Sequence, residues 1–94
     1  MARRRRRTVY IGDQRWKLER TRLRSDAGQC DYTAKVIRLC SSLSGLDLLD
    51  TLIHELTHAR WPDLSEDAVE EFATTLAGVI DAEGFRHGED EEAD

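Results

Sequence analysis

His54, Glu55 and His58 form a His-Glu-x-x-His sequence, the part of this chain with the clearest capacity for chemistry. The surrounding residues, 46–60, have the apolar spacing of a helix, and residues four apart on a helix lie on one face. Two imidazoles placed in this way can bind one metal ion, and the glutamate between them can act as a base toward a water that the metal activates. The spacing therefore predicts a metal site in which Glu55 is the catalytic base.

The helical phase separates the two histidines from the apolar side of the same segment. At about 100° per residue, His54 and His58 lie nearly opposite a broad apolar side formed by Leu48, Leu49, Leu52, Leu56 and Ala59. Core histidines would lie within that apolar side, so the position argues against them. Two exposed surface histidines without a metal would fit the position. The phase favours a polar face that is either open to solvent or covered by another segment.

A second helix, expected over residues 66–81, can supply that cover. Pro62 ends the first helix because it lacks a donor and restricts the preceding residue, and Asp63 or Ser65 can cap the next helix. So short a connection predicts two neighbouring, antiparallel helices. The apolar residues of the second helix that share one face are Val69, Phe72, Leu76 and Ile80.

Two carboxylates, Glu66 and Glu70, stand four apart at the edge of that face, in line with Ala73 and Ala77. These alanines are small enough to let the first helix come close. Catalytic zinc uses three protein ligands, and two histidines with one glutamate are a known set. We predict Glu66 as the third ligand, with Glu70 as the alternative. If Glu66 binds the metal, the Glu70 carboxylate can accept a hydrogen bond from the ring N–H of a ligand histidine that faces away from the metal. The competing explanation is that acidic residues favour the first turn of any helix.

Residues 54–58, with Glu66 and Glu70 on the following helix, resemble the gluzincins, the thermolysin-type class of zinc peptidases. In thermolysin the third ligand is a glutamate on the next helix, and an acidic residue follows it four positions later. Residues 28–32 and 36–39 are similar to the strand before the motif in small SprT-like and ImmA/IrrE-like metallopeptidases of bacteria and phages. The spacing from His58 to Glu66 is shorter than in thermolysin. The resemblance implies Zn²⁺ as the cofactor and a peptide or protein as the substrate.

Charge is distributed unevenly along the 94 residues, whose net charge is −5. Residues 1–24 contain ten Lys and Arg against two acids, and residues 25–94 contain four against seventeen. An unbroken cationic run can bind the phosphates of nucleic acid or an acidic partner, or it can be a solvated tail. That run consists of Arg3, Arg4, Arg5, Arg6 and Arg7.

The length predicts one small domain over residues 8–86, between a basic disordered arm (1–7) and an acidic disordered tail (87–94). His87, in the tail region, is expected to be a bystander. We predict an α+β fold, in which an antiparallel sheet of about three strands packs on the leucine side of the first helix and the second helix lies across it. The expected strands cover residues 8–11, 15–20 and 32–39.

No apolar run approaches the length of a membrane span, and the basic N-terminal residues lack the apolar stretch of a secretion signal. We therefore expect a cytoplasmic protein, in the host cytoplasm if the chain is phage-encoded, with no membrane partner. Cys30 and Cys40 would be about 30 Å apart on one extended segment, too far for a disulfide, so we expect two thiols. The sequence leaves the oligomeric state open.

The leading functional hypothesis is a zinc-dependent metallopeptidase that hydrolyses peptide bonds. Its substrate could add as a strand beside residues 32–39 if that strand is an edge. The alternative is a zinc-stabilised binding module without turnover, since a metal that joins two helices also stabilises a small domain. A nucleic-acid-associated protein that acts through the Arg run is a third hypothesis, compatible with either of the others.

Overall fold

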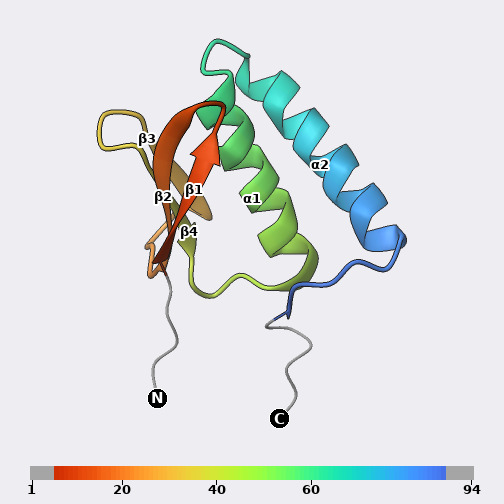
Figure 1. Cartoon of the computed structure of the whole chain (residues 1–94). Coiled ribbons are helices and arrows are strands. Elements are labelled where there is room, and N and C mark those ends of the chain that lie inside the picture. Colours follow the sequence, from red (N-terminus) through yellow and green to blue (C-terminus); the bar gives the residue numbers. More distant parts are fainter. Residues whose placement is uncertain (1–5, 89–94) are drawn as a thin grey trace.

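The computed structural model describes residues 6–88, which form a four-stranded sheet with both helices on one of its faces (Figure 1). α1 lies between the sheet and α2, and it contacts strands β1, β3 and β4 as well as α2. The predicted α+β class is confirmed. The elements, in chain order, are β1 (Arg6–Ile11), β2 (Gln14–Thr21), β3 (Gly28–Asp31), β4 (Val36–Cys40), α1 (Gly45–Arg60) and α2 (Glu66–Ala82).

The sheet has the strand order β1-β2-β4-β3 and is mixed, so it has one strand more than the three or so expected and one parallel pairing beside two antiparallel ones. β1 pairs antiparallel with β2, and β3 pairs antiparallel with β4. β2 and β4 run parallel, with Leu18 opposite Ile37. The parallel pair is possible because the chain leaves β2, forms β3 at the far edge of the sheet, and returns as β4 between β2 and β3.

A turn at residues 32–35 explains the extra strand. The Asp31 carboxylate accepts a hydrogen bond from the Ala34 N–H at 3.0 Å, and Lys35 has φ +57°. An Asp side chain that bonds the backbone ahead of it favours such a turn. The segment that we expected as one strand over residues 32–39 is therefore a turn followed by β4.

The hairpin of β3 and β4 also shortens the expected distance between the two cysteines. Cys30 on β3 lies opposite Ile37, and Cys40 ends β4 three residues further on, so their separation is about 10 Å rather than the expected 30 Å. This distance still exceeds the reach of a disulfide. Both cysteines are free thiols.

The core lies between the sheet and α1, because alternate residues of β2 and β4 point at the helix. Leu48 is the buried contribution of α1, and Leu52, Leu56 and Ala59 pack against the same cluster, as the helical phase predicts. The buried residues of this core are Trp16, Leu18, Ile37, Leu39 and Leu48. With its leucine side on the sheet, α1 turns His54 and His58 away from the core.

α2 packs on α1 through Val69, Ala73 and Ala77, each at most 1% exposed. Ser65, one of the two predicted caps, accepts a hydrogen bond from the Ala68 N–H at 3.1 Å. Of the apolar residues expected to share one face, Val69 is buried and Phe72 is 50% exposed. The two alanines lie in the contact, as expected, because small side chains let the helices approach closely.

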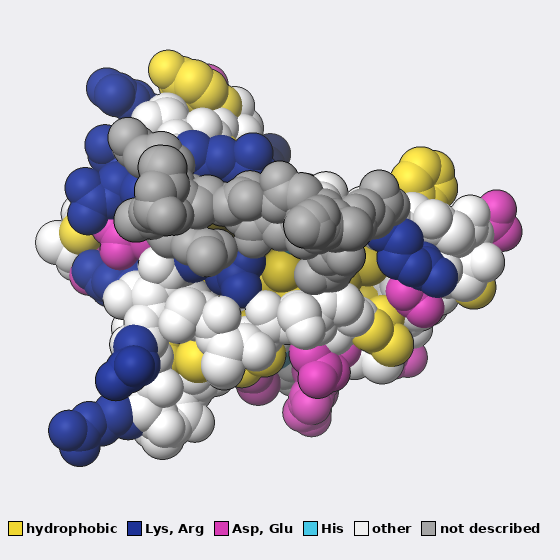
Figure 2. All heavy atoms as spheres, turned by 90° about the horizontal axis from the view of Figure 1, so that it is seen from below, with side chains coloured by type: hydrophobic (Ala, Val, Ile, Leu, Met, Phe, Trp, Pro, Cys, Tyr) yellow, Lys and Arg dark blue, Asp and Glu magenta, His cyan; other side chains and the backbone are white. Residues whose placement is uncertain are grey.

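Basic residues belong mainly to the sheet and acidic residues mainly to the helices (Figure 2). β1 begins at Arg6, inside the predicted arm, so Arg6 and Arg7 are strand residues. Arg3, Arg4 and Arg5 lie outside the described residues, as do residues 89–94 of the predicted tail. Within residues 6–88, neither helix is both long and apolar enough to cross a membrane.

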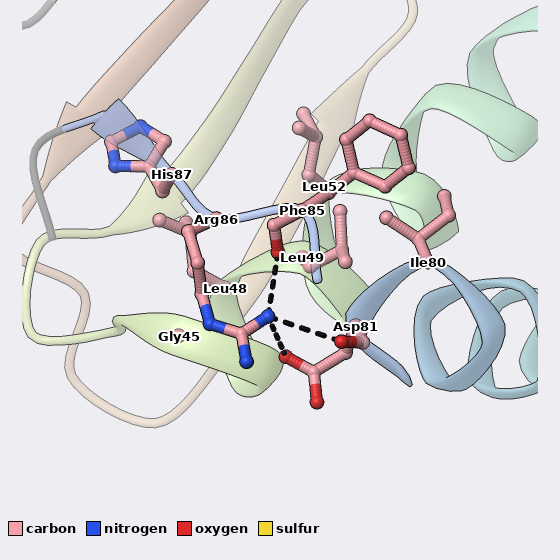
Figure 3. Close-up of a pocket in the computed structure, with 9 residues that line it drawn as sticks. All are labelled: Gly45, Leu48, Leu49, Leu52, Ile80, Asp81, Phe85, Arg86 and His87. Atoms are coloured by element: carbon pink, nitrogen blue, oxygen red, sulfur yellow. Dashed lines mark hydrogen bonds and ion pairs between the residues drawn. The ribbon is translucent and has the colours of Figure 1, made fainter. Parts of the chain in front are cut away.

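α2 ends in a Schellman motif at Gly84, whose φ is +95°. The Gly84 N–H donates to the Asp81 carbonyl at 3.0 Å and the Phe85 N–H to the Ile80 carbonyl at 3.4 Å, the two bonds that define this motif. Phe85 and Ile80 thereby line an apolar pocket of about 160 Å³ between the start of α1 and the end of α2 (Figure 3). His87 lines the same pocket and takes no part in the cluster of histidines on α1.

Candidate metal centre

The helical hairpin brings His54, His58 and Glu66 together. The two histidines lie one turn apart on α1, and Glu66 is the first residue of α2. The two Nε2 atoms are 3.2 Å apart, and the Glu66 carboxylate oxygens lie 3.2 Å from His54 Nε2 and 2.9 Å from His58 Nε2. The structure thus collects in one place the three residues that the sequence predicts as ligands.

The donor set and its dimensions fit a divalent ion of the zinc type. Ligand atoms at about 2.0–2.1 Å from a tetrahedral ion lie about 3.3 Å from one another, close to the 2.9–3.2 Å found here. Two imidazole nitrogens and one carboxylate are also a donor set of catalytic zinc. The histidine side chains are 19% and 17% exposed, against 67% for Glu66. Glu66 is therefore the most exposed of the three side chains.

Glu70, the alternative ligand, lies one turn further along α2 and outside this cluster. Its side chain is exposed and lines a groove that it shares with Glu66. Within residues 6–88, no hydrogen bond joins Glu70 to either histidine. The geometry favours Glu66 as the third ligand, and the outer role of Glu70 stays a prediction.

Glu55 follows His54 on α1 and lies close to Gly28 of β3, and it is only 8% exposed. Burial is the main cause that raises the pKa of this carboxyl above its ordinary range; the neighbouring His54 and His58 act in the opposite direction, and Glu66 adds to the increase. A carboxylate with a raised pKa is a stronger base than an exposed glutamate. Its position and its basicity both suit the predicted role.

Gly28 on β3 makes room for Glu55. A Cβ atom at this position would lie 2.8 Å from Thr51 Cγ2 and 3.0 Å from both Cγ and Oε2 of Glu55. A larger residue would therefore push the helix, the carboxylate or the strand out of place. Sequence reasoning missed Gly28 as a site residue, because only the packing of β3 on α1 reveals the close approach.

Gly28→Ala is expected to lower the free energy of unfolding by about 1–3 kcal/mol, the usual cost of overpacking. Gly78→Ala provides the matched control, since Gly78 lies within α2 and a Cβ there would meet nothing within 4 Å. This control should raise stability by about 1 kcal/mol, because alanine favours a helix. Urea denaturation measures both changes, and equal effects of the two substitutions would contradict the close approach at Gly28.

β3 is an edge strand beside the candidate metal centre. The Cys40 N–H donates to the Ala27 carbonyl at 2.8 Å, which identifies these two residues as a hydrogen-bonded pair. By the alternation of antiparallel ladders, Gly28 and Cys30 then direct their N–H and C=O groups away from β4, toward the free edge. Both residues line a shallow pocket with His54, Glu55, His58 and Glu66. The condition set for residues 32–39, that they form an edge strand, is not met, because β4 lies inside the sheet and β3 is at the edge.

Tyr32 also borders this pocket and was not predicted as a site residue. Its hydroxyl donates to the His58 carbonyl oxygen at 3.2 Å, and its ring packs edge-on against Trp16. Burial, followed by the neighbouring Cys30, raises the pKa of Tyr32. Burial and then the charge of Glu55 raise the pKa of Cys30 to about 11. Both groups are therefore neutral at neutral pH.

A groove of about 400 Å³ extends from the metal centre between α1, α2 and the residues before β3. Glu55 and Glu66 line it together with His54. No Lys or Arg of the described chain lines it. The further carboxylates along it are those of Asp26, Asp47, Asp50 and Glu70.

Comparisons with protein-family models, with curated proteins and with solved structures find no match to this chain.

Proposed function

We propose that this protein is a zinc-dependent metallopeptidase of reduced size, resembling the gluzincins. The observation that supports the proposal is the arrangement of His54, His58 and Glu66 around one point, with the buried carboxylate of Glu55 beside them. The cytoplasm remains the location expected for this activity.

Zn²⁺ held by His54, His58 and Glu66 would supply a Lewis acid that activates water and polarises a peptide carbonyl. Glu55 accepts the proton from the attacking water and returns it to the leaving nitrogen. Its burial keeps competing solvent away from the carboxylate and holds the side chain in one place between α1 and β3.

The free edge of β3 provides a way to hold the substrate. An extended peptide can pair with the outward N–H and C=O groups of Gly28 and Cys30, which adds a strand to the sheet. Such a peptide would lie across the pocket that contains His54, Glu55 and His58. Backbone pairing alone accepts many sequences, so any selectivity must come from the side-chain grooves.

The acidic groove gives the expected selectivity. Its carboxylates favour a substrate with Lys or Arg near the bond that is cleaved, by charge complementarity. Neutralising one of them should reduce this preference. Asp47→Asn is suitable because Asp47 lines the groove, and Asp67→Asn is its control, since both residues lie in the first turn of a helix and Asp67 is outside the groove.

The test is cleavage of a random peptide library by the zinc-loaded protein, read by mass spectrometry. We expect cleavage that stops with a chelator, returns with zinc and favours basic residues beside the cut. Asp47→Asn should weaken that preference and Asp67→Asn should not. A protein that holds stoichiometric zinc and cleaves no peptide would support the zinc-stabilised binding module instead.

A further inference from the structure

The face of the sheet opposite the helices has no covering element among residues 6–88 (Figure 1). Since Trp16 and Leu18 point into the core, Arg15 and Lys17 of the same strand point to this outer face. The same alternation places Tyr10 there, because Val9 and Ile11 on either side of it pack against the core.

Three outer-face residues form one patch across β1 and β2. Tyr10 lies directly opposite Arg15, and Lys17, opposite Thr8, is the next residue on the same face. The Tyr10 side chain is 70% exposed. We refer to Tyr10, Arg15 and Lys17 as the outer-face patch.

The charges of this patch are available to a ligand. The acidic residues of the outer face are already paired: Glu19 with Arg6 at 3.1 Å and with Arg38 at 3.8 Å, and Asp31 with Arg38 at 3.8 Å. Neither Arg15 nor Lys17 forms an ion pair within the described chain.

Charge is distributed unevenly between the sheet and the helices as well. Residues 6–24 contain seven Lys and Arg against two acids, and residues 45–82 contain one against nine. In Figure 2 most of the basic side chains accordingly lie on the side of the sheet, at the left of the view. A polyanion is attracted to the sheet layer and repelled by the helical layer.

We propose that the outer-face patch binds single-stranded nucleic acid, with phosphates on Arg15 and Lys17 and an unpaired base stacked on Tyr10. Cationic side chains beside an exposed aromatic ring are the combination that single strands use. An acidic protein segment would use the charges but has no need of the ring. The patch and the metal centre lie on opposite sides of the sheet, so one ligand does not block the other.

The experiment is fluorescence anisotropy of a labelled single-stranded oligonucleotide with the full chain over a series of salt concentrations. The double variant Arg15→Ala/Lys17→Ala should bind more weakly than Arg60→Ala/Arg86→Ala, which removes two equal charges elsewhere. Loss of two phosphate contacts should also reduce the slope of log K against log salt by about 1.4. Tyr10→Ala should weaken binding by about fivefold or more, and Tyr10→Phe should retain it, because stacking needs only the ring.

Circular dichroism establishes that these exposed-site variants are folded. Equal losses from the two double variants would overturn the proposal, because binding would then follow net charge alone. Equal competition by polyglutamate, together with an unchanged affinity of Tyr10→Ala, would assign the patch to an acidic protein partner. Tighter binding of duplex with Tyr10→Ala unaffected would exclude the stacked base. None of these readouts depends on peptide hydrolysis, so a failed peptidase assay leaves them unchanged.

Discussion

Glu55→Gln is expected to lower peptide hydrolysis by at least about a hundredfold, the lower range for loss of a general base, while zinc content stays at the wild-type level. Glu55 is close to the two histidines but outside the ligand group that they form with Glu66. The amide has nearly the same shape as the carboxylate and cannot accept the proton. Hydrolysis at saturating zinc, beside metal analysis of the same samples, measures both quantities.

Stability provides the control for this variant. A carboxyl whose pKa is raised in the folded state binds its proton more tightly there than in the unfolded chain. It therefore destabilises the folded state at a pH above the folded pKa. This destabilisation disappears as the pH falls below the pKa of the unfolded chain. Burial has this effect on Glu55. Metal-free Glu55→Gln should therefore be at least as stable as the wild type at neutral pH, with a smaller difference in acid. Full hydrolysis by a folded, zinc-loaded Glu55→Gln would remove Glu55 from the mechanism.

Loss of a ligand should have the second large effect. We expect His54→Ala, His58→Ala and Glu66→Ala each to weaken zinc binding on the order of a hundredfold or more, since a lost outer contact alone typically costs about 10–100-fold. The physical reason is that each variant leaves only two of the three donors that converge within 4.8 Å. Metal content after dialysis, with isothermal titration of zinc into the metal-free proteins, measures the loss.

Zinc binding at this site should also raise the temperature of thermal unfolding. Zinc at about a hundred times its dissociation constant stabilises the folded state by about 2.7 kcal/mol, which for a domain of this size raises the Tm on the order of 10 °C. The wild type should show this increase, and the three ligand variants should not.

Glu70→Ala is the matched control, because Glu70 carries the same charge one turn along α2 and lies outside the cluster. It should keep most of the zinc affinity and most of the increase in Tm. Normal zinc binding by Glu66→Ala, combined with loss in Glu70→Ala, would exchange the roles of the two glutamates.

The local features of the site could be predicted because they depend on residues close together in the chain. The spacing of four between His54 and His58 needs only a helix to place both imidazoles on one face. Pro62 and Ser65 fix the connection, so Glu66 must begin a neighbouring helix. The helix bounds agree with the predicted ones to within one residue at each end. The apolar spacing of α1 likewise determined which side faces the sheet.

The apolar spacing of α2 predicted its contact with α1 only in part. Periodicity shows that apolar residues share a side, but it does not show which part of that side meets α1. Val69 of that side is buried beside Ala73 and Ala77, whose small side chains permit a close approach, whereas Phe72 remains half exposed. Side-chain size in the assembled pair outweighed hydrophobicity in the single helix.

The sequence by itself determined the two helices and the histidine pair, and it limited the third ligand to Glu66 or Glu70, because these features rest on contacts within a turn or across a short connection. Only the tertiary structure decided the mixed sheet, the edge position of β3, the burial of Glu55 against Gly28, and the place of Tyr32. Strand order and register depend on partners that are distant in the chain. β2 and β4, for example, pair in parallel although β3 lies between them in the sequence. A local pattern can specify that a residue is in a strand, but the neighbour beside which that strand lies is chosen by the packing of the complete core.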